Sequence, residues 1–253
     1  MILPPMLLMI DDYNAPSILS GLTVCETLFE LVPKAEVRIY NRGDVIFDAL
    51  LHKLYSQDAE VLDKSLSCML SCLAVLERDP KKADHLRLTT RYDQIFEVLL
   101  SNVSTSTQIP LRFVLWKNLK FYVPVMGITS ARYLQDIFSH MEHDIEVVND
   151  KTLIEILQSL CAVMQATQVR IPNHAARILK FLLQNLLYTV REYPSRKSLK
   201  QKVKEESVLC LKMLYDCDSK FVGEILTKIS VQETDLAPFF TFIKFESKIN
   251  QTL

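Results

Sequence analysis

The chain has 253 residues, of which 49% are hydrophobic and 23% charged, and its formal net charge at pH 7 is −1. This composition is typical of a chain that buries a core. The near-zero net charge argues against a surface built as a whole for nucleic acid or anionic lipid. Only four glycines are present, too few for the turns and phosphate-binding loops of β-sandwiches and Rossmann folds. With Leu and Ile abundant throughout, we predict an all-α protein.

The chain opens with an apolar stretch, MILPPMLLMI, which Asp11 and Asp12 close. A secretory signal is excluded because no Lys or Arg precedes the stretch and no small-residue cleavage site follows it. A membrane span needs about twice this length, and Pro4-Pro5 interrupts the run. We expect a helix or extended segment at the edge of a longer helical array. Two alternatives stay open: this edge continues N-terminally or meets a partner, or it folds back onto the next helix.

The rest of the chain shows helical periodicity. Apolar residues recur at steps of three and four, as at Leu62, Leu66, Met69 and Leu73, which is the pattern of one buried helix face. Asp58 is the predicted N-cap of that helix, and Asp79-Pro80 is predicted to end it. In chain order the patterns predict about eleven helices, over residues 15–32, 42–55, 59–78, 89–103, 110–126, 129–142, 151–168, 173–191, 198–216, 219–230 and 233–249.

Taken in pairs, these helices recur about every 35 to 45 residues, near the period of HEAT and armadillo repeats. Several are apolar on more than one side, as at Leu182-Leu183 and Leu186-Leu187. A helix that lies between two neighbours in a stack needs such a surface. We therefore predict a HEAT/armadillo-like α-solenoid of antiparallel helix pairs, forming one helical-repeat domain over residues 1–253. A compact helical bundle is the alternative.

Two segments resemble a known family. The first is Pro4-Pro5-Met6-Leu7-Leu8-Met9-Ile10-Asp11-Asp12-Tyr13, followed by Gly21-Leu22 in the next helix. The second runs from Cys161 to Leu183 and contains Val169-Arg170-Ile171-Pro172 between two helices. Both are similar to the Tel-two-interacting protein two family, the third subunit of the TTT co-chaperone complex. Family members are longer than this chain, and the resemblance is to their C-terminal half.

The resemblance implies an α-solenoid scaffold without catalytic activity or cofactor. It implies binding to the large TTT subunit, Tel-two-interacting protein one, and through it to the Tel-two subunit. The complex would deliver newly made phosphatidylinositol-3-kinase-related kinases to the heat-shock chaperone system. We expect a cytoplasmic and nuclear protein that contacts neither membrane nor nucleic acid directly.

One run of charge is the first candidate binding site. Between Arg191 and Lys204 the sequence carries six cations and one acid in fourteen residues. The run could dock an acidic or phosphorylated partner or act as a nuclear import signal, and it supports an alternative function as a helical-repeat adaptor for acidic partners. The other interpretation is an exposed loop and the polar face of the next helix. The candidate residues are Arg196, Lys197, Lys200 and Lys202.

The last predicted helix is the second candidate. It carries Phe239, Phe240, Phe242 and Phe245, more aromatic surface than a capping helix needs, and we predict that part of it binds a partner. The alternative is the hydrophobic seal of the C-terminal repeat. Trp116, the one tryptophan, is either core or an interface anchor, and the sequence does not separate the two.

Residues that could support metal binding or catalysis are sparse. His140 and His143 share a helix face beside Asp144, but a solvated helix end explains them without a metal. Cys68 and Cys72 lie one turn apart among apolar residues, where core packing is expected. All six cysteines are expected to be free thiols in a reducing compartment. No Gly-x-Ser-x-Gly elbow or phosphate loop is present, and we predict that the protein is not an enzyme.

Overall fold

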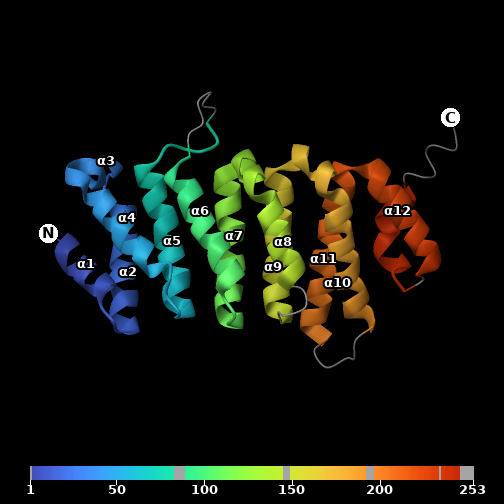
Figure 1. Ribbon diagram of the computed structural model, residues 1–253, viewed down its shortest axis with the longest axis horizontal. Coiled ribbons are helices and arrows are strands. Elements are labelled where there is room, and N and C mark those ends of the chain that lie inside the picture. The colour runs from blue at the N-terminus through green and yellow to red at the C-terminus, as the bar shows by residue number, and fades with distance from the viewer. Residues whose placement is uncertain (1, 83–88, 145–148, 192–196, 234, 246–253) are drawn as a thin grey trace. The chain divides into compact units, whose positions relative to one another are not determined.

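A computed structural model describes residues 2–82, 89–144, 149–191, 197–233 and 235–245. These residues form helices and short connections and no β-strand (Figure 1). The predicted all-α class is confirmed. The chain divides into two compact units, Met1–Gly127 and Ile128–Leu253. A single domain over residues 1–253 stays a prediction.

Unit 1 is built from three packed helix pairs, α1 with α2, α4 with α5, and α6 with α7. Within it α5 lies between α2 and α7, so these three form one layer (Figure 1). Short connections force the paired helices to run antiparallel, as HEAT/armadillo-like repeats do. The elements are α1 (Leu3–Asp11), α2 (Ala15–Leu31), α3 (Lys34–Arg38), the 3-10 helix η1 (Ile39–Asn41), α4 (Arg42–Lys53), α5 (Ala59–Leu76), α6 (Arg91–Thr105) and α7 (Ile109–Met126).

Unit 2 repeats this two-layer arrangement. One layer is formed by α8, α10 and α12, and the other by α9, α11 and η4. The pairs α10 with α11 and α12 with η4 connect the layers. The elements are η2 (Gly127–Tyr133), which begins at the last residue of unit 1, α8 (Leu134–Asp144), α9 (Asp150–Ala166), η3 (Gln168–His174), α10 (Ala175–Arg191), α11 (Lys197–Cys217), α12 (Ser219–Gln232) and η4 (Ala237–Phe245).

The core of unit 1 lies between its two layers. Leu62, Leu66, Met69 and Leu73, the predicted apolar face of α5, are at most 2% exposed. Trp116 is 0% exposed, so its indole belongs to the core and is not an interface anchor. Burial of such stripes is the main source of stability for helices of this length.

The N-terminal stretch forms a helix that folds back onto α2. Met6 and Ile10 of α1 are buried at this contact. Gly21 of α2 makes the approach possible, because a Cβ atom there would lie 2.9 Å from the backbone nitrogen of Ile10. The opposite side of α1 is not covered in unit 1: Leu8 is 75% exposed.

The N-terminus of α5 follows its local sequence signal, and the C-terminus comes slightly earlier than expected. The Asp58 carboxylate accepts hydrogen bonds from the backbone N–H groups of Glu60 (2.9 Å) and Val61 (3.0 Å), which confirms the predicted N-cap. The helix ends at Leu76, three residues before the expected stop at Asp79-Pro80.

Three segments differ from the expected helices. Residues 129–133, expected to begin a helix over 129–142, belong to the 3-10 helix η2. Residues 34–41 form the short α3 and η1, where Tyr40 and Asn41 adopt left-handed backbone angles (φ 55° and 56°). Residues 237–245 form a 3-10 helix instead of part of an α-helix over 233–249, and Phe240 breaks its regularity (φ −104°). Phe240 is 3% exposed. Packing of η4 against α11 and α12 therefore determines the conformation of this segment more than helix propensity does.

Candidate functional site

An apolar groove of about 580 Å³ lies in unit 1 between α1, α2, α3 and α4; we call it the N-terminal groove. Its apolar walls come mostly from α2, and α1, α3 and α4 supply the remainder. Two of the wall side chains, Ile2 and Leu31, are 63% and 77% exposed. The lining residues are Ile2, Leu3, Thr23, Val24, Thr27, Leu28, Leu31, Val32, Glu36, Val37, Arg42 and Ile46.

Exposed apolar side chains also occur outside the groove lining: Leu8 on α1 is 75% exposed, and Tyr40 beside α4 is 84% exposed. Leu8 lies on the side of α1 that faces away from α2, so of these two residues only Tyr40 adjoins the groove, through its contact with Arg42. Large apolar side chains are typical of interaction sites where they gather on one surface.

The polar edge of the groove includes Arg42. Its guanidinium carbon lies 5.5 Å from the centre of the Tyr40 ring, a cation–π contact that positions both side chains next to the groove. A left-handed backbone angle costs about 1–2 kcal/mol for most non-glycine residues and less for Asn, so the cost here falls mainly on Tyr40. Such strain is retained where surrounding structure enforces it, commonly at functional surfaces. Tyr and Arg are also the residues most enriched among interface hot spots.

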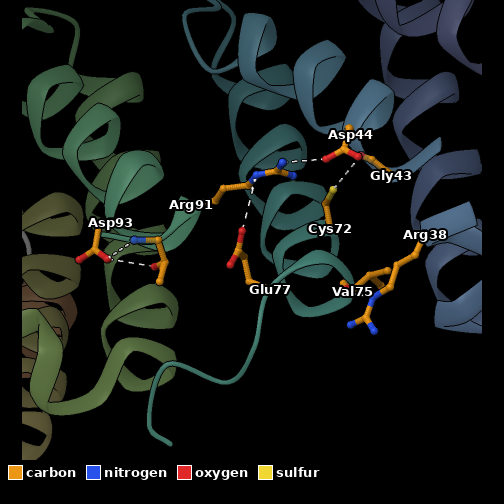
Figure 2. A network of polar contacts seen from close by, with 9 residues as sticks. Arg38, Gly43, Asp44, Cys72, Val75, Glu77, Arg91 and Asp93 are labelled. Carbon is orange, nitrogen blue, oxygen red and sulfur yellow. Dashed lines mark hydrogen bonds and ion pairs between the residues drawn. The ribbon is translucent and has the colours of Figure 1, made fainter. Parts of the chain in front are cut away.

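Arg91, the first residue of α6, forms ion pairs with α4 and with the residue that follows α5 (Figure 2). From the start of α6 it contacts Asp44 of α4 at 2.7 Å and Glu77, just after α5, at 3.6 Å. Its guanidinium carbon also lies 4.9 Å from the centre of the Phe47 ring. One side chain therefore connects three helices.

Backbone carbonyls make the second set of contacts in this region. Arg38 Nε donates to the Val75 carbonyl oxygen at 2.6 Å, which fixes α3 to the end of α5 (Figure 2). Cys72 Sγ lies 3.9 Å from the Gly43 carbonyl oxygen. A Cβ at Gly43 would meet the end of the Leu76 side chain, which would have to shift to make room for it.

A second, polar cleft of about 640 Å³ lies between α2, α5 and α7. Lys64 pairs with Glu26 across α5 and α2, and Lys117 pairs with Asp63 at 2.6 Å across α7 and α5. The hydrogen bond with Glu26 raises the pKa of Lys64 above its usual value. Because opposite charges already face each other here, the cleft presents little net charge to a ligand.

In unit 2 the structure brings the two candidate surfaces together. Lys204, at the end of the basic run, places Nζ 5.9 Å from the centre of the Phe239 ring. We call Lys200, Lys204 and Phe239, all half-buried, the Lys–Phe surface, because Lys200 lies one turn before Lys204 on the same side of α11. Lys202 is exposed and points to another side of the helix. This adjacency was not predicted, because Lys204 and Phe239 are 35 positions apart in the sequence.

The other candidate residues of unit 2 do not contribute a described side chain to the Lys–Phe surface. Phe240 is buried and packs in the unit. Arg196 lies outside the described residues, and for Lys197, Phe242 and Phe245 the description covers only the backbone of α11 and η4. A partner-binding role for these residues stays a prediction.

No metal centre is assembled within the described parts of the chain, where no three His, Cys, Asp or Glu side chains are grouped so as to hold an ion. His140 and His143 lie in the last turns of α8, with Asp144 buried at its end. Cys68 and Cys72 are fully buried, as core packing predicts, and burial raises the pKa of Cys72 to about 12. None of the described helices is long and apolar enough to cross a bilayer.

The groove and the Arg91 contacts are the features that sequence reasoning missed. The available signal was the pair Gly21 and Gly43, two of only four glycines, both within helices where glycine is disfavoured. Gly21 permits the close approach of α1 to α2 beside the groove, and Gly43 lies where a Cβ would meet the Leu76 side chain of α5.

No family model matches the chain. It is similar to TELO2-interacting protein 2 of Mus musculus, with 30% identity over 239 residues, which is 92% of this chain and 47% of the relative. The proteins of the same name from Rattus norvegicus (29% identity over 239 residues, 92% and 47%) and Homo sapiens (28% over 234 residues, 90% and 46%) are similar too. The chain spans about half the length of the curated relatives it matches. The resemblance predicted from its two motifs is thereby confirmed: the chain is similar, over about 90% of its length, to curated proteins named TELO2-interacting protein 2.

Proposed function

We propose that this chain is a non-enzymatic helical-repeat scaffold subunit of the TTT co-chaperone complex. The observation that carries the proposal is its similarity, over about 90% of its length, to relatives whose name states an interaction with TELO2. The two-layer helical repeat of each unit supports it, because stacked helix pairs present extended surfaces for partner binding.

The direct partner in this proposal is the large TTT subunit, Tel-two-interacting protein one. Through it the chain would reach the Tel-two subunit, the phosphatidylinositol-3-kinase-related kinases and the heat-shock chaperone system. It would thereby support kinase stability, the DNA damage response and TOR signalling in cytoplasm and nucleus. No cofactor, membrane or direct nucleic-acid contact is part of the proposal.

Docking would use the N-terminal groove. Its apolar walls favour an amphipathic helix of the partner, and the exposed Ile2, Leu31 and Tyr40 would be covered on binding. Arg42 at its edge suits a carboxylate on the polar side of that helix. Such an interface is mainly hydrophobic, so its affinity depends weakly on salt.

Co-expression of the chain with the large TTT subunit, followed by gel filtration at low and at high salt, tests this function. A complex that co-elutes at both salt concentrations is expected. No complex at either concentration, with a helical circular dichroism spectrum for the chain, would contradict the proposal.

A second candidate function is an adaptor that binds acidic or phosphorylated segments. The contact between Lys204 and Phe239 favours it, because cations beside an aromatic ring suit a ligand with both a phosphate and an apolar group. Binding through several cations weakens steeply with salt. Lys204→Glu should then strongly weaken the association, whereas a salt-resistant complex that tolerates this substitution would exclude the adaptor.

A further inference from the structure

Two cysteines on neighbouring helices of unit 2 face each other. Cys161 lies on α9 and Cys210 on α11, and their sulfur atoms are 3.1 Å apart. A disulfide bond is about 2.0 Å long, so the two sulfurs need to approach by about 1 Å to form one. The two helices pack side by side in one layer, and the cysteines are 49 positions apart in the sequence.

The two thiols are not equivalent. Cys210 is 0% exposed, and its S–H has two acceptors in reach: the Cys161 sulfur and the Leu157 carbonyl oxygen, at 3.3 Å. Cys161 is the more accessible, at 9%. A hydrogen bond from Cys210 lowers the pKa of Cys161, whereas burial raises that of Cys210. The Glu206 carboxylate, which accepts from Gln158 at 2.7 Å, is the nearby charge that opposes a thiolate.

We propose that Cys161 and Cys210 form an oxidation site that reacts with hydrogen peroxide. The Cys161 thiolate attacks one peroxide oxygen, the O–O bond breaks, and the departing oxygen leaves as water after protonation. Cys161 then carries a sulfenic acid. The Cys210 sulfur attacks it, the S–O bond breaks, and the hydroxide leaves as a second water with the Cys210 proton. Overall two thiols lose two electrons to form a disulfide, and one hydrogen peroxide becomes two waters.

The remaining cysteines lack this combination of features. Cys217 is the most accessible cysteine, but burial and the Asp216 carboxylate raise its pKa. Cys25 and Cys68 are both 0% exposed, and the Cys68 S–H donates to the Leu22 carbonyl oxygen at 3.3 Å. A hydrogen bond with Cys25 and burial raise the pKa of Cys68, which disfavours its thiolate. We therefore expect selective oxidation at Cys161 and Cys210.

This site goes beyond the proposed scaffold function and does not depend on it. A disulfide between Cys161 and Cys210 joins α9 to α11 and closes a loop that contains α10. Closing a loop of this length restricts the unfolded chain. The expected consequence is a rise of several degrees in the melting temperature of the folded chain, which a thiol reductant reverses.

The test is treatment of the full folded chain with hydrogen peroxide, followed by thiol alkylation, proteolysis and mass spectrometry without reductant. We expect a Cys161–Cys210 linked peptide that dithiothreitol cleaves, formed at least about tenfold faster than any other disulfide. In Cys210→Ala a sulfenic acid should accumulate at Cys161 and be trapped by dimedone. Cys161→Ala should give neither product, and the matched control Cys217→Ala should behave as the parent chain.

Three results would overturn the proposal. The first is oxidation that begins at Cys217 or between Cys25 and Cys68. The second is the absence of any linked peptide while Cys161 is oxidised to the sulfinic acid. The third is a crosslinking rate that rises with urea below the unfolding transition, since reaction would then require an unfolded chain. Circular dichroism of each alanine variant establishes that the chain remains folded, and alanine suits these sites because a buried cysteine packs as a small apolar residue.

Discussion

Arg177 of α10 shows how one side chain connects neighbouring elements of unit 2. Its guanidinium donates to both carboxylate oxygens of Glu142 on α8, at 2.6 and 2.8 Å, and to Ser139 Oγ at 3.0 Å. The hydrogen bond from Arg177 lowers the pKa of Glu142 below its ordinary value of 4.5. Both side chains are partly exposed, so water screens the interaction.

The stability that this pair contributes should depend on pH. A carboxylate with a lowered pKa in the folded state stabilises the protein above its unfolded pKa and stops doing so as the pH falls through the folded value. Glu142→Gln should lower the free energy of unfolding by up to about 1 kcal/mol at pH 7, and the difference should vanish toward pH 3. Urea titrations of both proteins between pH 3 and 7 measure it. A difference that does not change with pH would contradict the role of the ion pair.

At the scale of a helix, α5 illustrates how a local signal sets an end. Asp58 caps two N–H groups that would otherwise lack a partner. Asp58→Ala should reduce the free energy of unfolding by about 1 kcal/mol, whereas Asp58→Asn keeps an acceptor and should cost little. Gln57→Ala, at the exposed preceding position, is the control. Chemical denaturation gives all three values, and equal stability of Asp58→Ala and Asp58→Asn would exclude the cap.

Between helices, Arg91 is the clearest case for substitution. Arg91→Lys keeps the charge but loses the planar group that reaches Asp44 and Glu77 together and stacks on Phe47. We expect a loss of about 1 kcal/mol, less than for Arg91→Ala, because the sites are one-third exposed and screened. Thermal melts of both variants at low and high salt measure this. Full stability of Arg91→Lys would show that charge alone holds these helices.

At the scale of the whole molecule, partner binding should depend on the N-terminal groove and not on surface apolar residues in general. Leu31 in the groove and Val231 on α12 are 77% and 78% exposed, which makes them a matched pair. Each change to Glu should alter the free energy of unfolding by less than about 0.5 kcal/mol. Leu31→Glu should nevertheless weaken co-elution with the large TTT subunit at least about tenfold, and Val231→Glu should not.

The binding results for these two variants test the choice of docking surface separately from the proposed scaffold function. If the parent chain binds and both variants bind equally well, the docking surface lies elsewhere and the scaffold function stands. If Val231→Glu loses binding as well, the effect is not specific to the groove.

The sequence by itself determined the class of fold and most helix positions. Apolar steps of three and four, few glycines and the cap at Asp58 are local signals, and each acts within a few residues of the element it specifies. The two motifs, Pro4 to Tyr13 and Cys161 to Leu183, likewise predicted the similarity to the TELO2-interacting protein 2 relatives. Short segments such as residues 34–41 and 237–245 were less predictable, because a single buried side chain, Val37 or Phe240, anchors each of them and the propensities of so few residues are weak.

Only the tertiary structure decided which surfaces exist. The N-terminal groove needs α1 to fold onto α2 at Gly21, and the Lys–Phe surface needs α11 beside η4. The facing sulfurs of Cys161 and Cys210 depend in the same way on the packing of α9 against α11. Each feature joins residues far apart in the chain, and periodicity within one helix specifies which face is buried but not which side chain it meets there.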